Sequence, residues 1–99
     1  MAHKVWSADP NASLTRRLGI APQEPGSGRG GGDDVASGDD NGCPDIWELS
    51  NGDVAVIGCD LTDSYQSRLP DGVSIGSNER LVVIPRGMII AAKVDIPDA

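Results

Sequence analysis

The dipeptide Asn51-Gly52 lies between two apolar-patterned runs, Asp45 to Leu49 and Val54 to Cys59, and it constrains the fold more than any other feature. A two-residue type I′ turn needs positive φ at both central positions, which asparagine and glycine tolerate better than other residues. The dipeptide therefore predicts a β-hairpin, and it marks where the folded part of the chain begins.

A two-residue turn also sets which side chains share a face of the hairpin. Leu49 then lies opposite Val54 and Trp47 opposite Val56, so these four residues are predicted to form the core face. The other face is only partly apolar, because Glu48 lies on it. Its apolar members are predicted to bind a partner; they are Ile46, Ala55 and Ile57.

Two segments after the hairpin predict a helix and a strand. From Asp60 to Pro70, leucine and tyrosine side chains recur every four residues, which indicates a helix of about two turns capped by Thr62 or Asp60. Arg80 to Ile84 is a continuous β-branched run of the kind found in strands that are buried on both faces. We expect this run to be the central strand.

The C-terminal segment fits two alternatives. Pro85 would begin a helix from Arg86 to Lys93, although Gly87 weakens that helix by about 1 kcal/mol relative to alanine. If the helix does not form, Met88 to Val94 is the alternative strand. The chain after residue 42 thus predicts a small α+β domain with the order β-hairpin, helix, strand, and helix or fourth strand.

The chain before the hairpin has a different composition. Residues 1–20 form a flexible basic head, in which Ser13 to Gly19 predicts a short helix. Residues 21–42 are rich in glycine and aspartate and hold Val35 as their only large aliphatic side chain, too little apolar surface to offset the entropy of ordering. We therefore predict a disordered linker at 21–42 and a folded domain at 43–99.

The net charge of −7 is unevenly distributed, with +2 in the head, −4 in the linker and −5 in the domain. An acidic domain repels phosphate backbones, so nucleic-acid binding is disfavoured. No stretch is long and apolar enough to span a membrane, and the N-terminus lacks the apolar core of a signal peptide. We therefore expect a cytoplasmic protein without a membrane partner.

The predicted domain lacks the residues that catalysis or a cofactor would need. The only histidine, His3, lies in the head, so neither a Ser-His-Asp triad nor a Cys-His pair forms within the domain. A structural zinc site would need about four ligands, which the two cysteines cannot supply. We predict no catalytic residue, no metal ligand and no cofactor.

Two motifs of the linker also fail on their spacing. The glycines from Gly28 to Gly32 follow no predicted strand and precede no Lys-Ser or Lys-Thr pair, so they do not form a phosphate-binding loop. The ligand order of an EF-hand is absent after Asp39, where the twelfth position is Ser50 instead of glutamate. The linker aspartates therefore indicate only a weak, nonspecific attraction of cations. These aspartates are Asp33, Asp34, Asp39 and Asp40.

The two cysteines, Cys43 and Cys59, stand at the outer ends of the hairpin. In the register above their side chains point to opposite faces, so a disulfide would need a bulge near Gly42 or Gly58. A reducing cytoplasm also disfavours the bond. We predict two free, partly buried thiols.

Trp6 is an aromatic side chain on the basic head, a composition typical of a short segment that folds on a partner. The alternative is that Trp6 docks on its own domain. Separately, the run from Arg80 to Arg86, RLVVIPR, resembles the strand of AbrB-like antitoxins and transition regulators, which dimerise through swapped hairpins and bind DNA. That resemblance implies DNA contacts by Arg80 and Arg86, although Glu79 replaces the glycine that precedes the family's strand.

Roughly the C-terminal sixty residues also resemble a group of short, acidic, uncharacterised actinobacterial proteins. The motifs that carry this resemblance are GCPD from Gly42, GDVAVIG from Gly52, ERLVVIPR from Glu79 and AAK from Ala91. The group has no established activity, so the resemblance implies a small cytoplasmic accessory or regulatory protein and no catalytic residue.

These observations together predict a non-catalytic accessory or regulatory protein that acts by protein–protein interaction, as an antitoxin-like or regulator partner. It would bind another protein or a second copy of itself. One alternative is a DNA-binding transcriptional regulator of the AbrB-like swapped-hairpin type. Another is a substrate or precursor chain recognised through its N-terminal segment.

Overall fold

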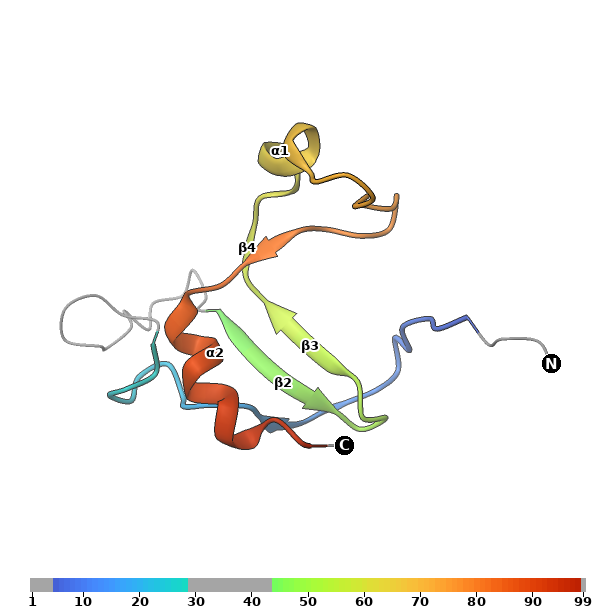
Figure 1. The fold of residues 1–99 in the computed structure, drawn as a ribbon. Helices are drawn as coiled ribbons and strands as arrows, with labels where there is room; N and C mark the ends of the chain where they lie inside the picture. The colour runs from blue at the N-terminus through green and yellow to red at the C-terminus, as the bar shows by residue number, and fades with distance from the viewer. Residues whose placement is uncertain (1–4, 29–43, 99) are drawn as a thin grey trace.

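A computed structural model describes residues 5–28 and 44–98 of the chain. Its main layer is a three-stranded antiparallel sheet of β1 (Leu14–Arg17), β2 (Asp45–Leu49) and β3 (Val54–Ile57), with β2 in the centre. Helix α2 (Arg86–Ala92), which continues into the 3-10 turn η2 (Lys93–Asp95), packs on one face of this sheet (Figure 1). This arrangement confirms the predicted α+β class.

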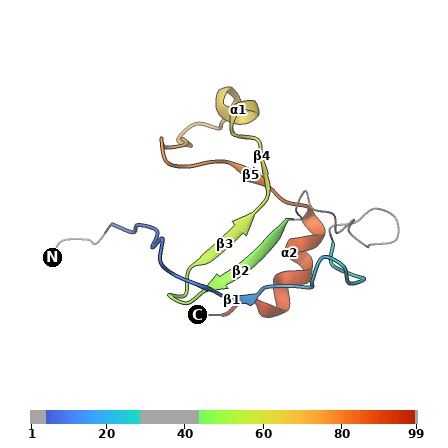
Figure 2. The ribbon, with the colours of Figure 1, turned by 180° about the vertical axis from the view of Figure 1, so that it is seen from behind.

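A second unit, which we call the arm (residues 58–84), extends away from the sheet (Figures 1 and 2). The arm leaves the sheet through β4 (Cys59–Asp60) and forms α1 (Thr62–Tyr65) and the 3-10 turn η1 (Gln66–Arg68). It returns through β5 (Val82–Val83), which pairs with β4 in an antiparallel ladder. The predicted helix between residues 60 and 70 is confirmed, as a shorter α-helical turn followed by a 3-10 turn.

The loop between β2 and β3 is one residue longer than predicted. The N–H of Gly52 donates to the carbonyl of Leu49 at 2.9 Å, so Ser50 and Asn51 are the central residues of the turn. Gly52 follows them with φ of +90°. A three-residue hairpin loop commonly ends in this way on a left-handed glycine. The predicted two-residue Asn-Gly turn is therefore wrong.

The longer loop shifts the pairing register of the hairpin by one residue. Ile46 pairs with Val56, and Glu48 pairs with Val54. Because successive side chains of a strand point to opposite faces, a shift of one residue turns all of β3 over relative to β2. The predicted core face of Leu49, Val54, Trp47 and Val56 is therefore wrong.

The core lies between α2 and the face of the sheet that carries Ile46. Met88 and Ala92 are four residues apart, so they point from one side of α2 into this face. The buried hydrophobic residues of the described chain are Leu18, Ile46, Met88 and Ala92, with Ile84 partly buried against them. The helical alternative for Arg86–Lys93 is thereby confirmed.

The N-terminal residues contribute a strand where we predicted a helix. β1 pairs with β2 through a bulge between Leu14 and Arg16. On the face away from α2, Arg17 donates to both carboxylate oxygens of Asp45 at 3.0 Å. This carboxylate raises the pKa of Arg17. The sequence of β1 is too short to favour a helix on its own, so pairing with β2 decides its conformation.

The folded part also extends into the predicted linker. Ser27 is fully buried, and the chain turns at Gly28 with φ of +79° against Gly87 of α2. The domain therefore includes residues outside the predicted range 43–99. Residues 29–42 of the predicted linker lie outside the described residues.

The run from Arg80 to Ile84 is not the central strand. Only Val82 and Val83 are in a strand, β5, and their exposed fractions are 37% and 39%. Among the residues that the structure describes, β5 pairs with the two-residue β4 alone, so its other edge is open. None of the helices formed by residues 5–28 and 44–98 is long and apolar enough to cross a membrane.

Candidate functional site

The outer edge of β3 is open: in the part of the chain that the structure describes, β3 pairs with β2 alone. Leu49 donates its N–H to the carbonyl of Asp53 at 2.8 Å, while Leu18 donates to Ile46 on the other side of β2 at 2.9 Å. Since backbone groups alternate in direction along an antiparallel strand, Asp53, Ala55 and Ile57 point toward β2. The N–H and C=O groups of Val54 and Val56 therefore point outward.

The side chains along this open edge are apolar and exposed. The exposed fractions are 51% for Val54, 45% for Val56 and 55% for Ile57, and Ala55 is half-buried. Proteins usually protect a sheet edge with lysine, proline or a bulge, and β3 has none of these. The edge is thus competent to pair with another strand.

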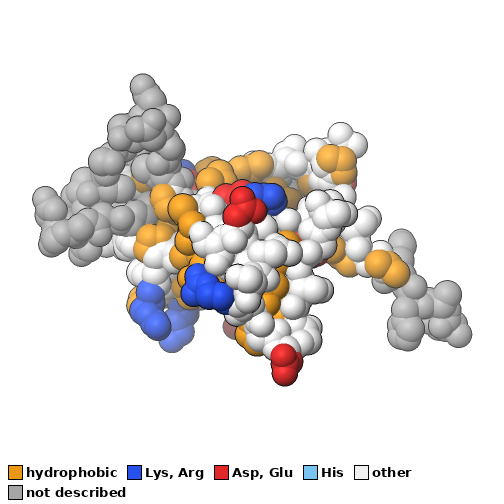
Figure 3. Space-filling view, turned by 90° about the horizontal axis from the view of Figure 1, so that it is seen from above, with side chains coloured by type: hydrophobic (Ala, Val, Ile, Leu, Met, Phe, Trp, Pro, Cys, Tyr) orange, Lys and Arg blue, Asp and Glu red, His pale blue; other side chains and the backbone are white. Residues whose placement is uncertain are grey.

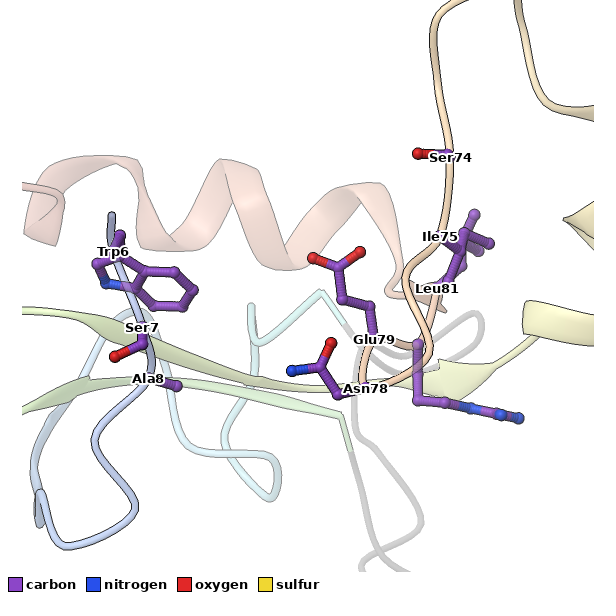
Figure 4. A pocket seen from close by; sticks show the side chains of 9 residues that line it. Trp6, Ser7, Ala8, Ser74, Ile75, Asn78, Glu79 and Leu81 are labelled. Atoms are coloured by element: carbon purple, nitrogen blue, oxygen red, sulfur yellow. The ribbon is translucent and has the colours of Figure 1, made fainter. Parts of the chain in front are cut away.

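A cavity of about 750 Å³ lies between the N-terminal segment and the arm. Trp6, Ser7 and Ala8 form one wall. Residues of the arm form the other, and they are Ser74, Ile75, Asn78, Glu79, Arg80 and Leu81. The ring of Trp6 and the carboxylate of Glu79 face the space between the walls from opposite sides (Figure 4). The volume lies within the range of ligand pockets, about 300–1,000 Å³.

The two walls are attached to the two ends of β3. At the start of the strand, the indole N–H of Trp6 donates to Asp53 at 3.1 Å. Beyond its end, Leu61 donates its N–H to the carbonyl of Leu81 at 3.0 Å, which holds the returning half of the arm. β3 therefore runs between the attachment points of the two walls. No residue of β3 is among those that line the cavity, so the strand edge and the cavity are two neighbouring parts of one candidate site.

Glu79 is positioned by its own loop. One carboxylate oxygen, Oε1, accepts the N–H of Gly76 at 2.7 Å, and the N–H of Glu79 donates to the carbonyl of Gly76 at 3.0 Å. This reciprocal pair keeps a negative charge on the cavity wall, and no arginine or lysine among residues 5–28 and 44–98 forms an ion pair with it.

Asp60 holds the base of the arm together. It accepts the hydroxyl of Thr62 at 2.7 Å and the N–H of Thr62 at 3.1 Å, and it accepts Nε of Arg80 at 2.9 Å. Thr62 is buried, and its hydroxyl oxygen accepts the N–H of Leu81 at 2.7 Å. These contacts, with Thr62 first, lower the pKa of Asp60 to about 2.

The low pKa of Asp60 predicts how the arm responds to acid. A carboxyl group whose pKa is depressed by folding stabilises the fold above its unfolded pKa, near 4, and this stabilisation disappears as pH falls toward 2. We expect the amide resonances of Thr62 and Leu81 to shift with a midpoint near 2 in an NMR titration. Asp60→Asn should abolish that step, and a midpoint near 4 would contradict the network.

The predicted partner-binding residues fall in different places. Ile46 is 5% exposed and belongs to the core, so its assignment to an exposed face is wrong. Ile46 is buried because α2 packs on the face that carries it. The shifted register places Ala55 and Ile57 on the opposite face. Trp6 docks through its indole N–H, yet 69% of the residue stays exposed.

The sequence did not identify Val54 and Val56 as surface residues, nor the cavity beside them. The signal for the register was present in Ser50-Asn51-Gly52-Asp53, which suits a three-residue loop that ends on glycine. The cavity had no local signal, because its walls are far apart in the sequence. Figure 3, which looks down onto the arm, shows hydrophobic side chains exposed among polar ones on this face of the molecule.

The arginines of the DNA-binding alternative are not equivalent. Arg80 donates to Asp60, and its Nη2 lies 2.9 Å from the same carboxylate, so its charge is largely used within the arm. Arg86 is exposed at the start of α2. The structure therefore does not bring two unpaired arginines together at this position.

The described residues contain no group of three or more histidine, cysteine, aspartate or glutamate side chains that would hold a metal ion. Cys59 is exposed on β4, in contrast to the partly buried thiol that we predicted. Cys43, His3 and the linker aspartates lie outside the described residues, as do the linker glycines after Gly28.

Comparison with known proteins adds no relative: no protein-family model, curated protein or solved structure matches this chain. The resemblances to short actinobacterial proteins and to AbrB-like regulators stay predictions. The geometry of the site is therefore the basis for a functional proposal.

Proposed function

We propose that this chain is a non-catalytic, cytoplasmic accessory or regulatory protein that acts by binding another protein. Its contact surface is the outer edge of β3 with the exposed side chains of Val54, Val56 and Ile57. The observation that carries the proposal is the outward direction of the Val54 and Val56 backbone groups on an unprotected apolar edge.

An open edge can bind a strand of another protein and also fix how that strand is aligned with β3. A strand that joins the edge satisfies outward N–H and C=O groups by main-chain hydrogen bonds, and alternate side chains give specificity. Burial of three half-exposed aliphatic side chains adds a hydrophobic contribution. An unprotected edge of this kind otherwise promotes aggregation, so a binding partner is a reason for a protein to retain it.

DNA binding is the less favoured alternative on the same observations. Counterion release requires several cationic side chains that are free to contact phosphate. Arg80 is engaged by Asp60, and the whole chain carries a net charge of −7. The antitoxin-like or regulator-partner role fits an apolar contact surface better.

A charge on the edge tests the proposed function. Val56→Lys should reduce co-purification of the partner from native cells by about tenfold or more, because a lysine on an edge strand opposes strand addition. Ile90→Lys is the matched control, since Ile90 is also an exposed aliphatic residue but lies on α2. The captured proteins are compared by quantitative mass spectrometry, and circular dichroism establishes that both variants are folded.

Equal capture by the two variants would contradict the proposal, because the partner would then not depend on β3. Loss of capture by Ile90→Lys alone would move the contact surface to α2. If a protein is captured by Ile90→Lys but not by Val56→Lys, the result supports binding at the edge of β3.

A further inference from the structure

The open edge and the adjoining cavity together specify the kind of partner, an inference that rests on the proposed function. We propose that the site binds an extended peptide segment that carries a basic side chain. The segment adds to β3 as a fourth strand, and its basic side chain enters the cavity between Trp6 and Glu79.

The extended conformation follows from the spacing of the walls. β3 has four residues and spans about 13 Å at a rise of about 3.3 Å per residue. Trp6 is held at Asp53 before the strand, and Leu81 is held at Leu61 beyond it. A segment laid along β3 therefore meets both walls, and it satisfies the outward backbone groups of Val54 and Val56.

The basic side chain follows from the chemistry of the walls. Tryptophan is the aromatic ring that attracts cations best, and the ring of Trp6 remains largely exposed although its N–H is engaged. Glu79 presents a carboxylate from the opposite wall (Figure 4). Arg80 also lines the cavity, but its charge is paired with Asp60 within the arm. A lysine or arginine in the cavity is attracted by the ring of Trp6 and by the carboxylate of Glu79.

The overall charge favours a cationic partner over a second copy of this chain. Each copy carries a net charge of −7, so two copies repel each other, whereas a cationic segment is attracted. Two copies joined edge to edge would also leave the cavity without the cation that its walls favour. The self-associated state is therefore an outcome of the test rather than the proposal.

The test uses the full chain and a library of short random peptides displayed on phage. We expect the enriched peptides to alternate apolar residues and to contain lysine or arginine. The best peptide is then synthesised with a fluorescent label, and its affinity is measured by fluorescence polarisation.

Backbone methylation of that peptide separates strand addition from nonspecific apolar contact. Methylation of the N–H groups that face β3 should weaken binding about tenfold or more, whereas methylation at the alternate positions should not. This two-residue period is measured on the unmodified protein, so it does not depend on a variant that folds poorly. Equal effects at all positions would overturn strand addition.

Two variants test whether the cavity binds the basic side chain of the peptide. Glu79→Gln removes the charge and keeps an oxygen that accepts the N–H of Gly76, and Trp6→Leu removes the ring and keeps an apolar side chain. Each variant should lower the affinity for the peptide about three- to tenfold, and the effect of Glu79→Gln should be smaller at high salt concentration. Replacement of the peptide's basic residue by glutamine should remove the difference between Glu79→Gln and the unmodified chain.

The outcomes distinguish this inference from the proposed function. Suppose that capture from native cells depends on Val56 but that neither Glu79→Gln nor Trp6→Leu changes the affinity for the peptide. The inference of a basic side chain in the cavity is then wrong, whereas the proposed function is supported. If the unmodified chain is a dimer in analytical ultracentrifugation that Val56→Lys dissociates, a second copy occupies the edge and the inference is overturned. A library without any binder also overturns it.

Discussion

Met88→Ala is expected to lower the free energy of unfolding by about 2–5 kcal/mol, the usual cost of removing a large side chain from a core. Met88 is 2% exposed and is the largest residue that α2 contributes to the core. Small domains are stable by only about 5–15 kcal/mol, so the loss would be a large part of the total. Denaturation by urea, followed by circular dichroism, measures the change.

Ile90→Ala is the control for that experiment. Ile90 lies in the same helix, two residues from Met88, but it is 63% exposed. We expect the free energy of unfolding to change by less than about 0.5 kcal/mol, because substitutions at exposed sites rarely have a larger effect. Equal effects of the two substitutions would show that α2 does not pack on the sheet through Met88 and Ala92.

Gly87→Ala is expected to destabilise the protein, although helix propensity alone predicts the opposite. Alanine is favoured over glycine in a helix by about 1 kcal/mol. A Cβ added at Gly87, however, would lie 2.7 Å from the Cα of Gly28, whose backbone passes against the first turn of α2. The neighbour is backbone, so it cannot turn aside as a side chain would.

The expected net cost of Gly87→Ala is about 1–3 kcal/mol, as for other overpacked contacts. Chemical denaturation gives the sign, and hydrogen exchange at Ser27 reports whether residues 21–28 separate from α2. Ser27 is fully buried beside this contact, so its amide should exchange faster in the variant. An increase in stability would mean that the close approach of Gly28 to α2 does not exist.

The elements with strong local signals were predicted correctly from the sequence. The hairpin and α2 follow from patterns within a few residues, namely a loop with glycine between apolar runs and apolar spacing after Pro85. α1 follows from the four-residue spacing of Leu61, Tyr65 and Leu69. Thr62 is its first residue and not its cap, and Asp60 accepts the N–H of Thr62. Such signals depend on neighbouring residues alone, so no tertiary information is needed to recognise them.

The errors concern contacts between distant segments. β1 was predicted as a helix because its pairing with β2 joins residues that are about thirty positions apart, such as Arg17 and Trp47. The run at Arg80 was assigned to the centre of a sheet because its composition suits a buried strand. Its actual partner, β4, has two residues and leaves it exposed, which composition does not reveal.

The candidate site shows the same division. From Asn51-Gly52 the sequence by itself determined that a hairpin forms and that one of its faces is incompletely covered. Only the tertiary structure decided which face is buried, because α2 packs on the face that carries Ile46. One additional loop residue turns β3 over relative to β2 and places Ala55 and Ile57 on the other face. The same is true of the cavity, since Trp6 and Glu79 line the same space only because the folded chain brings the head and the arm to opposite sides of it.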